Sequence, residues 1–301
     1  MNQTSVRKFV LLGLSNNYGL QIFFFVVFLG MYMVTISVNL LLILVVTLNP
    51  RLQTPMYFFL SNLSAIDICF SSTVVPKILL VTISQDKSIS FLGCATQMYF
   101  HLALGGSECL ILAVMAFDRY TAICKPLQYT IIMDKKLCVG LAVGCWIVSF
   151  INSCILTFLT FQLPFCKSNL IRHFFCEMPP LLRLSCRDIW FNEVVEYISG
   201  AIIALGSFLL ILVSYFCIVL TVIKIRTAKE RQKAFSTCAS HLAVVSLYYG
   251  TIMFMHLHPR AASSSEQDRV VTILYTVVTP LLNPIIYSVR NKEIKGAIKM
   301  Q

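Results

Sequence analysis

The stretch MAFDRYTAICKPLQY, residues 115–129, is the most informative part of this chain, because it places an acid and a base where a long apolar segment ends. Asp118 and Arg119 directly follow the apolar run 110–117, and charges at such a place are tolerated only near water or beside a partner. Lys125 and Pro126 cannot comfortably continue a helix, so a loop is expected to follow. The stretch therefore predicts a membrane helix that ends at the membrane surface.

The composition of the chain supports this interpretation. Of the 301 residues, 57% are apolar and 12% are charged, which leaves too little polar surface for a soluble protein of this size. Apolar runs long enough to cross a bilayer, at about 1.5 Å per residue, occur seven times in the chain. They cover residues 21–48, 56–82, 95–123, 137–160, 197–223, 235–257 and 270–289.

All of these runs are expected to be helices, because lipid offers no water to unpaired backbone groups and the alternating pattern of a barrel strand is absent. The connections are short except for the loop 161–196. The prediction is an all-α membrane protein with a single domain over 1–301. It consists of a seven-transmembrane helix bundle and a short amphipathic eighth helix in the tail, 290–301.

The positive charges predict how the bundle is oriented. The loops at residues 51, 119–136, 224–233 and 290–299 hold 14 Lys and Arg, against nine in the other loops. Because cytoplasmic loops are enriched in Lys and Arg, these loops and the C-terminus are expected in the cytoplasm, and the N-terminus outside. The formal net charge of +11 then describes a cytoplasmic face suited to anionic lipid or an acidic partner, without implying a nucleic acid.

Cysteine usage agrees with this orientation. Of the twelve cysteines, four lie on predicted outer segments, and four cysteines allow three pairings. An outer loop faces an oxidising compartment, so two disulfides are expected there. The four are Cys94, Cys166, Cys176 and Cys186. Asn2, followed by Gln3 and Thr4, is a predicted glycosylation acceptor on the same side.

Several motifs together resemble the vertebrate olfactory receptors, which are rhodopsin-like (class A) G-protein-coupled receptors. The resemblance runs from about residue 9 to 299, in the same order and spacing, and is to the larger, terrestrial-type branch. It implies disulfides between Cys94 and Cys176 and between Cys166 and Cys186. The motifs are PMYFFLSNLS (55–64), MAFDRYTAICKPLQY (115–129), Ser214 with Tyr215, KAFSTCASHL (233–242) and PLLNPIIYSVRN (280–291).

The resemblance implies an odorant receptor of the plasma membrane, in the cilia of sensory neurons. Such a receptor binds a small, mainly hydrophobic volatile within the helices and activates a stimulatory G protein of the olfactory type, which raises cyclic AMP. No enzymatic activity is expected. The alternative is a non-olfactory chemosensory receptor of the same fold.

The resemblance also assigns a set of switch residues. It implies that Asp118 holds Arg119 at rest and releases it when helices three and six separate. Tyr215 and Tyr287 would then swing into the opening. Pro284 lacks a backbone donor and frees a carbonyl in the seventh helix for Asn283 or water. The full set is Asp118, Arg119, Tyr120, Tyr215, Lys233, His241, Asn283, Pro284 and Tyr287.

Two carboxyl groups, Asp67 and Glu108, lie inside predicted spans, where a charge costs several kcal/mol unless it is paired or hydrated. One hypothesis is a polar site with Asn39, Ser107 and Asn283 that holds a sodium ion or a proton. The alternative is that one or both carboxyls are simply protonated and hydrogen-bonded. No other cofactor is expected.

Helical spacing predicts a ligand pocket. His101, Gly105 and Glu108 fall on one face of the third span, and Gly105 and Gly106 leave room beside them. On the sixth span the same spacing recurs, although such stripes are also typical of a helix core. The predicted lining is His101, Leu102, Gly105, Gly106, Ser199, Ile203, Tyr249, Ile252, Met253, His256, Tyr275 and Thr276.

Other classes of membrane protein fit the sequence less well. A transporter or channel would also hold acids within the membrane, but the number of spans is odd and no inverted repeat is visible. A retinal protein needs a lysine in its last span, and 270–289 contains none. Common enzyme motifs are absent. Two clusters, His256 with His258 and His173 with Cys176 and Glu177, resemble metal ligands, but Cys176 is expected in a disulfide.

Overall fold

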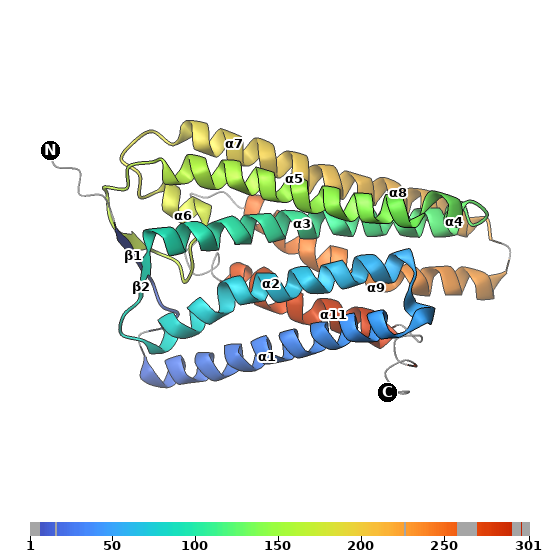
Figure 1. The fold of residues 1–301 in the computed structure, drawn as a ribbon, viewed down its shortest axis with the longest axis horizontal. Coiled ribbons are helices and arrows are strands. Elements are labelled where there is room, and N and C mark those ends of the chain that lie inside the picture. The colour runs from blue at the N-terminus through green and yellow to red at the C-terminus, as the bar shows by residue number, and fades with distance from the viewer. Residues whose placement is uncertain (1–6, 16, 226, 258–269, 291–295, 297–301) are drawn as a thin grey trace.

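The computed structural model describes residues 7–15, 17–225, 227–257, 270–290 and 296, without the side chains at 230, 233, 236, 237, 254–257, 289 and 290. Long helices run side by side along one axis (Figure 1). They are α1 (Tyr18–Leu48), α2 (Pro55–Ile83), α3 (Phe91–Cys124), α5 (Lys135–Phe161), α7 (Trp190–Gly200), α8 (Gly206–Ile223), α9 (Ala228–Leu257) and α11 (Thr279–Arg290).

Several of these helices begin at residues that favour a helix N-terminus. Asn17, Ser90 and Asp134 are the N-cap residues of α1, α3 and α5, and each side chain accepts a hydrogen bond from a backbone N–H of the first turn. Pro55 occupies the first position of α2, where a missing donor is harmless. These four helices therefore begin where the sequence supplies a capping side chain or a proline.

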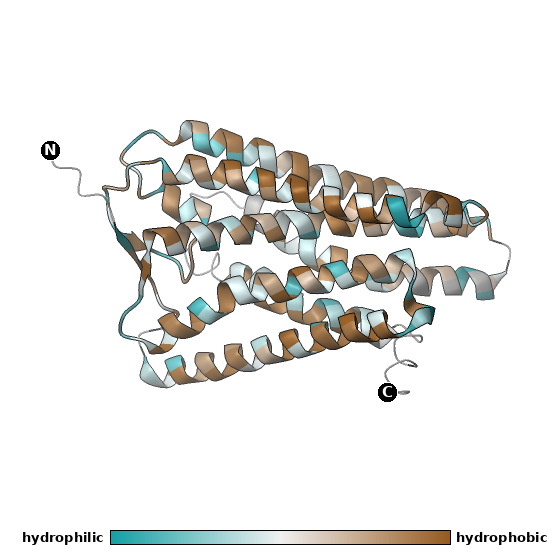
Figure 2. Ribbon diagram, in the orientation of Figure 1, coloured by the Kyte–Doolittle hydropathy of each residue, from teal (hydrophilic) through white to brown (hydrophobic). Residues whose placement is uncertain are grey.

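Within the described residues, six helices are long and apolar enough to span a membrane. The remaining predicted span, 235–257, lies in α9, whose apolar stretch Cys238–Met253 is shorter. The first residues of α9 are polar, and the apolar residues that dominate the helices give way to hydrophilic ones at many of their ends (Figure 2). The fold is thus mostly helical, as predicted.

Two details of the fifth and seventh helices differ from the prediction. The fifth helix begins at Trp190 rather than 197, because Glu193 and Glu196 interrupt the apolar run without preventing a helix. Each helix also contains a π-helical segment, η2 (Ala201–Leu205) between α7 and α8 and η3 (Leu274–Val278) before α11. Such segments often mark functional sites.

The predicted all-α class is incomplete, because one end of the bundle carries a small sheet. The strands β1 (Lys8–Leu11), β2 (Ser88–Ser90) and β3 (Leu170–Ile171) lie in the order β2-β1-β3. β1 is antiparallel to β2 and parallel to β3. This end, which also carries both disulfides and α6 (Met178–Leu182), is called the strand end. The opposite end is called the α4 end, after the short helix α4 (Tyr129–Ile132), and near it η1 (Pro50–Leu52) joins α1 to α2.

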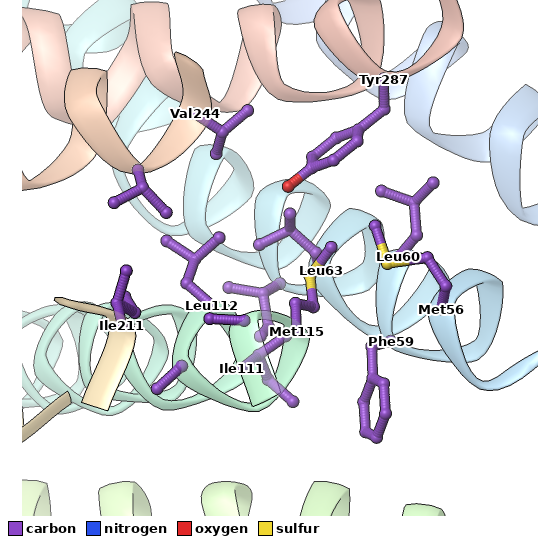
Figure 3. Packing of buried hydrophobic residues seen from close by; sticks show 14 of the residues in the cluster. Met56, Phe59, Leu60, Leu63, Ile111, Leu112, Met115, Ile211, Val244 and Tyr287 are labelled. Carbon is purple, nitrogen blue, oxygen red and sulfur yellow. The ribbon is translucent and has the colours of Figure 1, made fainter. Parts of the chain in front are cut away.

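The core lies where α3 packs against α2, α5, α8 and α9. Ile111, Leu112 and Met115 on α3 are fully buried, and Leu63 of α2 and Val244 of α9 pack into the same cluster (Figure 3). Lipid is as apolar as these side chains, so the cluster stabilises the bundle by close contact more than by removal from water. α3 is therefore the central helix of the bundle.

Candidate functional site

A cavity of about 850 Å³ opens at the strand end, between α3, α7, η2, α9, η3 and the loop before α7. Most of the residues predicted from helical spacing line it. They are His101, Leu102, Gly105, Gly106, Ser199, Ile203, Ile252 and Tyr275. Residues from four separate spans therefore meet around one space.

Three other predicted residues lie elsewhere. Met253 is 43% exposed on the outside of α9. Thr276 is fully buried and its hydroxyl donates to the carbonyl of Thr272, so it packs inside the helix bundle. Tyr249 lies against α8, one residue away from Tyr248, which does line the cavity. The side chain of His256, the fourth residue, lies outside the described residues.

The cavity also contains residues that helical spacing did not identify. On α9 the residue that was missed is Tyr248, four residues before the predicted Ile252. Glu177 reaches the cavity because the disulfide of its neighbour Cys176 ties the loop to α3. Phe70 and Leu156 line it from α2 and α5, and no signal in the sequence separates them from other apolar residues of those spans.

The two adjacent glycines on α3 have different surroundings. A Cβ atom added at Gly105 would meet Phe70 and Tyr248 at 3.8 and 4.0 Å, which is ordinary contact. A Cβ atom at Gly106 would lie 3.1 Å from the Ser149 hydroxyl of α5. Gly105 therefore leaves room in the cavity, whereas Gly106 allows α3 and α5 to pack closely.

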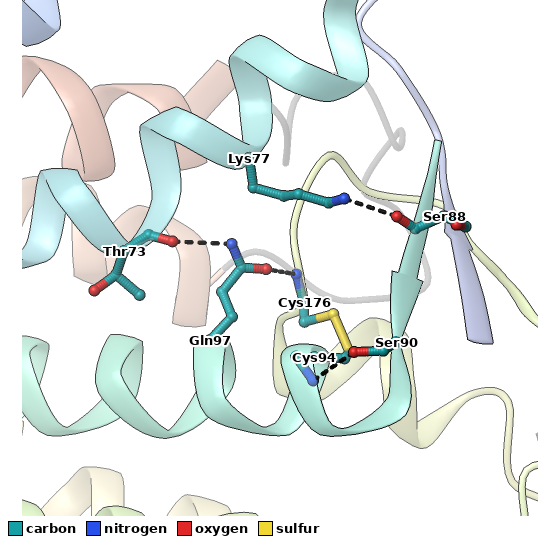
Figure 4. Close-up of a disulfide and its surroundings, with 8 residues drawn as sticks. Thr73, Lys77, Ser88, Ser90, Cys94, Gln97 and Cys176 are labelled. Carbon is teal, nitrogen blue, oxygen red and sulfur yellow. Dashed lines mark hydrogen bonds between the residues drawn. A yellow bond between two sulfur atoms is a disulfide. The ribbon is translucent and has the colours of Figure 1, made fainter. Parts of the chain in front are cut away.

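The loop over the cavity is fixed by a disulfide and by a glutamine (Figure 4). Cys94 at the start of α3 is bonded to Cys176, and their Cα atoms are 5.4 Å apart. The Gln97 side chain accepts from the backbone N–H of Cys176 at 2.9 Å and donates to the Thr73 carbonyl of α2 at 3.0 Å. The second disulfide joins Cys166 and Cys186 within the loop. The pairing is the one that the resemblance implies.

A chain of polar groups crosses the roof of the cavity. The Tyr275 hydroxyl donates to Glu177 Oε1 at 2.9 Å, and His101 Nε2 lies 3.4 Å from the same hydroxyl. The other Glu177 oxygen is 3.7 Å from His173 Nε2. Most of the cavity surface is apolar, although charged side chains also line it, namely Lys167, Arg172, Arg183 and Glu196.

Below the cavity, hydroxyl groups connect α3, α8 and α9. The Tyr248 hydroxyl donates to the Gly105 carbonyl at 2.8 Å. The Tyr249 hydroxyl lies 2.6 Å from Ser207 Oγ and 3.4 Å from the Cys109 carbonyl. Tyr248 and Tyr249 are consecutive on α9, so one helix carries both contacts.

The two carboxyl groups in the middle of the bundle are close together. Asn283 Nδ2 donates to Asp67 Oδ1 at 3.1 Å and to Glu108 Oε1 at 3.2 Å. The side-chain oxygens of Asn39 and Asn283 are buried without a hydrogen bond among the described residues. Ser107, which was expected here, donates to the Ala103 carbonyl of its own helix. Two buried carboxyl groups this close repel each other when both are ionised.

Asp118 and Arg119 do not form the ion pair that the resemblance implies. No ion pair within 4.0 Å joins them in the described structure. Asp118 instead accepts a hydrogen bond from the Tyr129 hydroxyl of α4 at 2.8 Å, and Arg119 Nε is buried without a hydrogen bond. Burial, and then the negative charge of Asp118, raise the pKa of Tyr129, so its hydroxyl remains a donor. The ring of Tyr120 lies 5.9 Å from Lys125 Nζ.

A histidine connects three helices near Arg119. His241 Nε2 lies 3.1 Å from the Leu112 carbonyl, which can only accept, so this nitrogen carries the proton. His241 Nδ1 therefore accepts from the Tyr215 hydroxyl at 2.7 Å, and the two rings stack. The contact joins α9 to α3 and α8. The hydroxyl of Tyr287 is buried nearby without a hydrogen bond among the described residues.

α11 continues through Pro284, and the carbonyl that this proline leaves without a helix donor has a different partner from the one expected. Pro284 cannot donate to the carbonyl four residues earlier, that of Pro280. Asn39 Nδ2 of α1 donates to this carbonyl at 3.2 Å, where Asn283 or water was predicted. The predictions for Asn2, for the Lys233 side chain and for the tail helix lie outside the described residues, apart from residue 296.

The helices are of membrane length, a loop covers a cavity at one end of the bundle, and hydrogen bonds join the helices towards the other end. This is the architecture of G-protein-coupled receptors. The chain belongs to the olfactory receptor family, since the family model "Olfactory receptor" matches residues 28–301. It is therefore a receptor and not an enzyme.

Curated relatives agree over almost the full length. The chain is 50% identical to Olfactory receptor 5G29 of Mus musculus over 298 residues, which are 99% of this chain and 95% of that protein. It is 49% identical to Olfactory receptor 5G3 of Homo sapiens, with the same coverage. It is 51% identical to Olfactory receptor 1F1 of Homo sapiens, with 99% and 96% covered.

Proposed function

We propose that this receptor binds a small, mainly hydrophobic volatile in the strand-end cavity and activates a stimulatory G protein of the olfactory type, raising cyclic AMP. The observation that carries the proposal is the cavity itself, because residues from α3, α7, η2, α9 and η3 meet there under a disulfide-bonded loop. A mainly apolar cavity binds a volatile through burial of about 25 cal/mol per Å² and a few hydrogen bonds.

The proposed orientation places the strand end outside the cell and the α4 end in the cytoplasm. The excess of Lys and Arg in the loops at the α4 end supports it, as do the disulfides at the other end. The whole chain then forms one receptor domain, with a glycosylated Asn2 outside and an amphipathic tail helix over 290–301 inside. The proposed location is the ciliary plasma membrane of sensory neurons.

In the proposed mechanism, the ligand acts on α9 through Tyr248 and its neighbour Tyr249. His241 lies on α9 about two turns away from Tyr248. Displacement of α9 breaks the hydrogen bond between His241 and Tyr215. The α4 end of α9, with Lys233, then moves outward. Arg119 becomes available to the G protein, while Tyr215 and Tyr287 fill the opening.

We also propose that Asp67 and Glu108 hold a sodium ion or a proton in the resting receptor. The shared donor Asn283 and the unpaired oxygens of Asn39 and Asn283 support this site. A sodium titration of the basal cyclic-AMP signal distinguishes the two ions, because only cation binding predicts a sodium effect that Asp67→Asn removes.

Replacement of Arg119 by Ala tests the coupling mechanism. The variant is expected to reach the cell surface at the wild-type level and to lose agonist-driven cyclic AMP, because the group offered to the G protein is gone. Arg51→Ala, which removes a charge from another loop at the α4 end, is the matched control and should signal normally. The mechanism is wrong if Arg119→Ala signals with wild-type potency and amplitude at normal surface levels.

A further inference from the structure

The mouth of the strand-end cavity is the part that is lined by exposed residues of the loop before α7. Three of these residues are cations, namely Lys167, Arg172 and Arg183. The other exposed loop residues of the lining, Ser168 and Leu170, are uncharged. Every exposed charge that the loop contributes to the mouth is therefore positive.

The two acids of the lining are less accessible. Glu177 Oε1 accepts from the Tyr275 hydroxyl at 2.9 Å, and its Oε2 is 3.7 Å from His173 Nε2. Glu196 lies on α7, and one of its carboxyl oxygens is buried. Both acids are only partly exposed, whereas the three cations are exposed. A ligand that enters from outside thus meets positive charge first.

The fold of the loop brings two of these cations close together. The backbone N–H of Lys167 donates to the Leu184 carbonyl at 3.3 Å, and Arg183 directly precedes Leu184. The disulfide between Cys166 and Cys186 holds the same two segments together. Neither cation forms an ion pair within 4.0 Å in the parts of the chain that the structure describes. Like charges on neighbouring segments repel each other, and an anion between them offsets the repulsion.

Beyond the mouth, the lining consists largely of apolar side chains that are buried or half-buried. A carboxylate there would lose its water without gaining a partner, which is unfavourable. A hydrocarbon chain gains free energy by burial in the same place. The cavity therefore fits a ligand that has an anionic head and an apolar chain. The apolar residues include Phe70, Leu102, Leu156, Ile203 and Ile252.

We infer that the receptor is selective for volatile carboxylic acids, which bind as carboxylates with the head between Lys167 and Arg183 and the chain against the apolar walls. The inference rests on the proposed function, since it takes the strand-end cavity as the odorant site. Carboxylic acids are ionised at neutral pH. A guanidinium such as that of Arg183 can hold a carboxylate through two parallel hydrogen bonds, and a cationic mouth draws anions towards the cavity.

Carboxylic acids and their methyl esters test the inference, because the ester keeps the chain and lacks the charge. The probes are butanoic, hexanoic and octanoic acids, each with its methyl ester, in medium buffered at neutral pH. Cyclic-AMP dose–response curves of cells that express the full chain should give about tenfold lower half-maximal concentrations for the acid of the active pairs. The ester has the larger apolar surface, so burial alone predicts the opposite order. Equal or better responses to the esters overturn the inference.

Variants of the mouth sharpen the test. Combining Lys167→Gln with Arg183→Gln should remove the advantage of the acid over its ester, whereas Lys167→Arg and Arg183→Lys keep the charge and should retain it. Arg187→Gln is the matched control, since it removes a charge from the same loop outside the cavity lining. Surface labelling checks that each variant is present. An advantage that survives the loss of both cations contradicts the inference.

The outcomes separate this inference from the proposed function. A receptor that responds to other volatiles but to none of these acids remains an odorant receptor without the acid selectivity. A receptor that responds to no volatile of a broad panel, in cells where another odorant receptor responds, contradicts both. If the double variant fails to reach the surface, the comparison of acids with esters on the wild-type receptor still decides the question.

Discussion

The two ends of the helix bundle are held together by different kinds of bond. At the strand end, two disulfides and a three-stranded sheet fix the loops, and Phe9 of β1 is fully buried against Phe91 and Phe165. At the α4 end, Tyr129 with Asp118 and Tyr215 with His241 are joined by single hydrogen bonds. A hydrogen bond contributes about 0.5–1.5 kcal/mol, so this end can rearrange at a small cost.

Buried polar groups near the α4 end also indicate that the helices there can rearrange. Arg119 Nε and the Tyr287 hydroxyl have no hydrogen bond among the described residues. Buried polar groups without a partner are unfavourable, and another arrangement of the helices could supply the partners. The loops around the cavity are thus fixed covalently, whereas the contacts described at the α4 end are hydrogen bonds that cost less to break.

The largest effect is expected from the disulfide between Cys94 and Cys176. Replacing either cysteine by Ser should remove most receptor from the cell surface, because the loss of a native disulfide costs about 2–5 kcal/mol. The double variant should be no worse than either single one, since both remove the same bond. Surface labelling measures the loss, and Cys154→Ser, at an exposed free cysteine, should have no effect. Additive losses would contradict the role given to this pair.

A change at the α4 end should alter signalling rather than receptor amount. His241→Phe keeps a ring but removes the bonds to Tyr215 and Leu112, so α9 is held less tightly to its neighbours. Basal cyclic AMP per surface receptor should rise, by about tenfold if the loss is near 1.4 kcal/mol. Leu242→Ala, on the exposed side of α9, is the control. Unchanged basal signalling would mean that these hydrogen bonds do not restrain the α4 end.

The smallest effect is expected between the two ends, at Tyr249. Tyr249→Phe removes the hydrogen bond to Ser207, which should weaken agonist potency by less than about tenfold and leave surface expression unchanged. Ser207→Ala should have a similar effect, and the double variant should be no weaker than the single ones. Dose–response curves with a common agonist measure this. Independent, additive shifts would show that the two hydroxyls do not transmit the signal together.

The sequence predicts the helices well because long apolar runs have few other solutions in lipid. It does not predict the sheet, since strands of two to four residues leave no periodic pattern. The π-helical segments are also missed, because an extra residue in a turn does not change composition. Both features depend on contacts between distant parts of the chain.

The cavity is predicted only in part, for a geometric reason. On α9 the spacing defines an apolar stripe but does not show whether Tyr248 or Tyr249 faces the cavity. If the helix is placed one residue out of register, a residue that lines the cavity is assigned to the core and the reverse. At the α4 end, Asp118 and Arg119 are adjacent on a helix, and adjacent side chains do not face each other. Tyr129, which does contact Asp118, is brought there by the fold of the loop.

The central place of β1 in the sheet has a consequence for the order in which the receptor is made. Residue Val10 pairs with Leu170, so the first strand to leave the ribosome finds its last partner only after four membrane helices have been synthesised. At about 5–20 residues per second, this last partner follows β1 by on the order of ten seconds, whereas β2, the other partner, is made after only two membrane helices. The sheet can therefore be completed only when more than half of the chain has been synthesised.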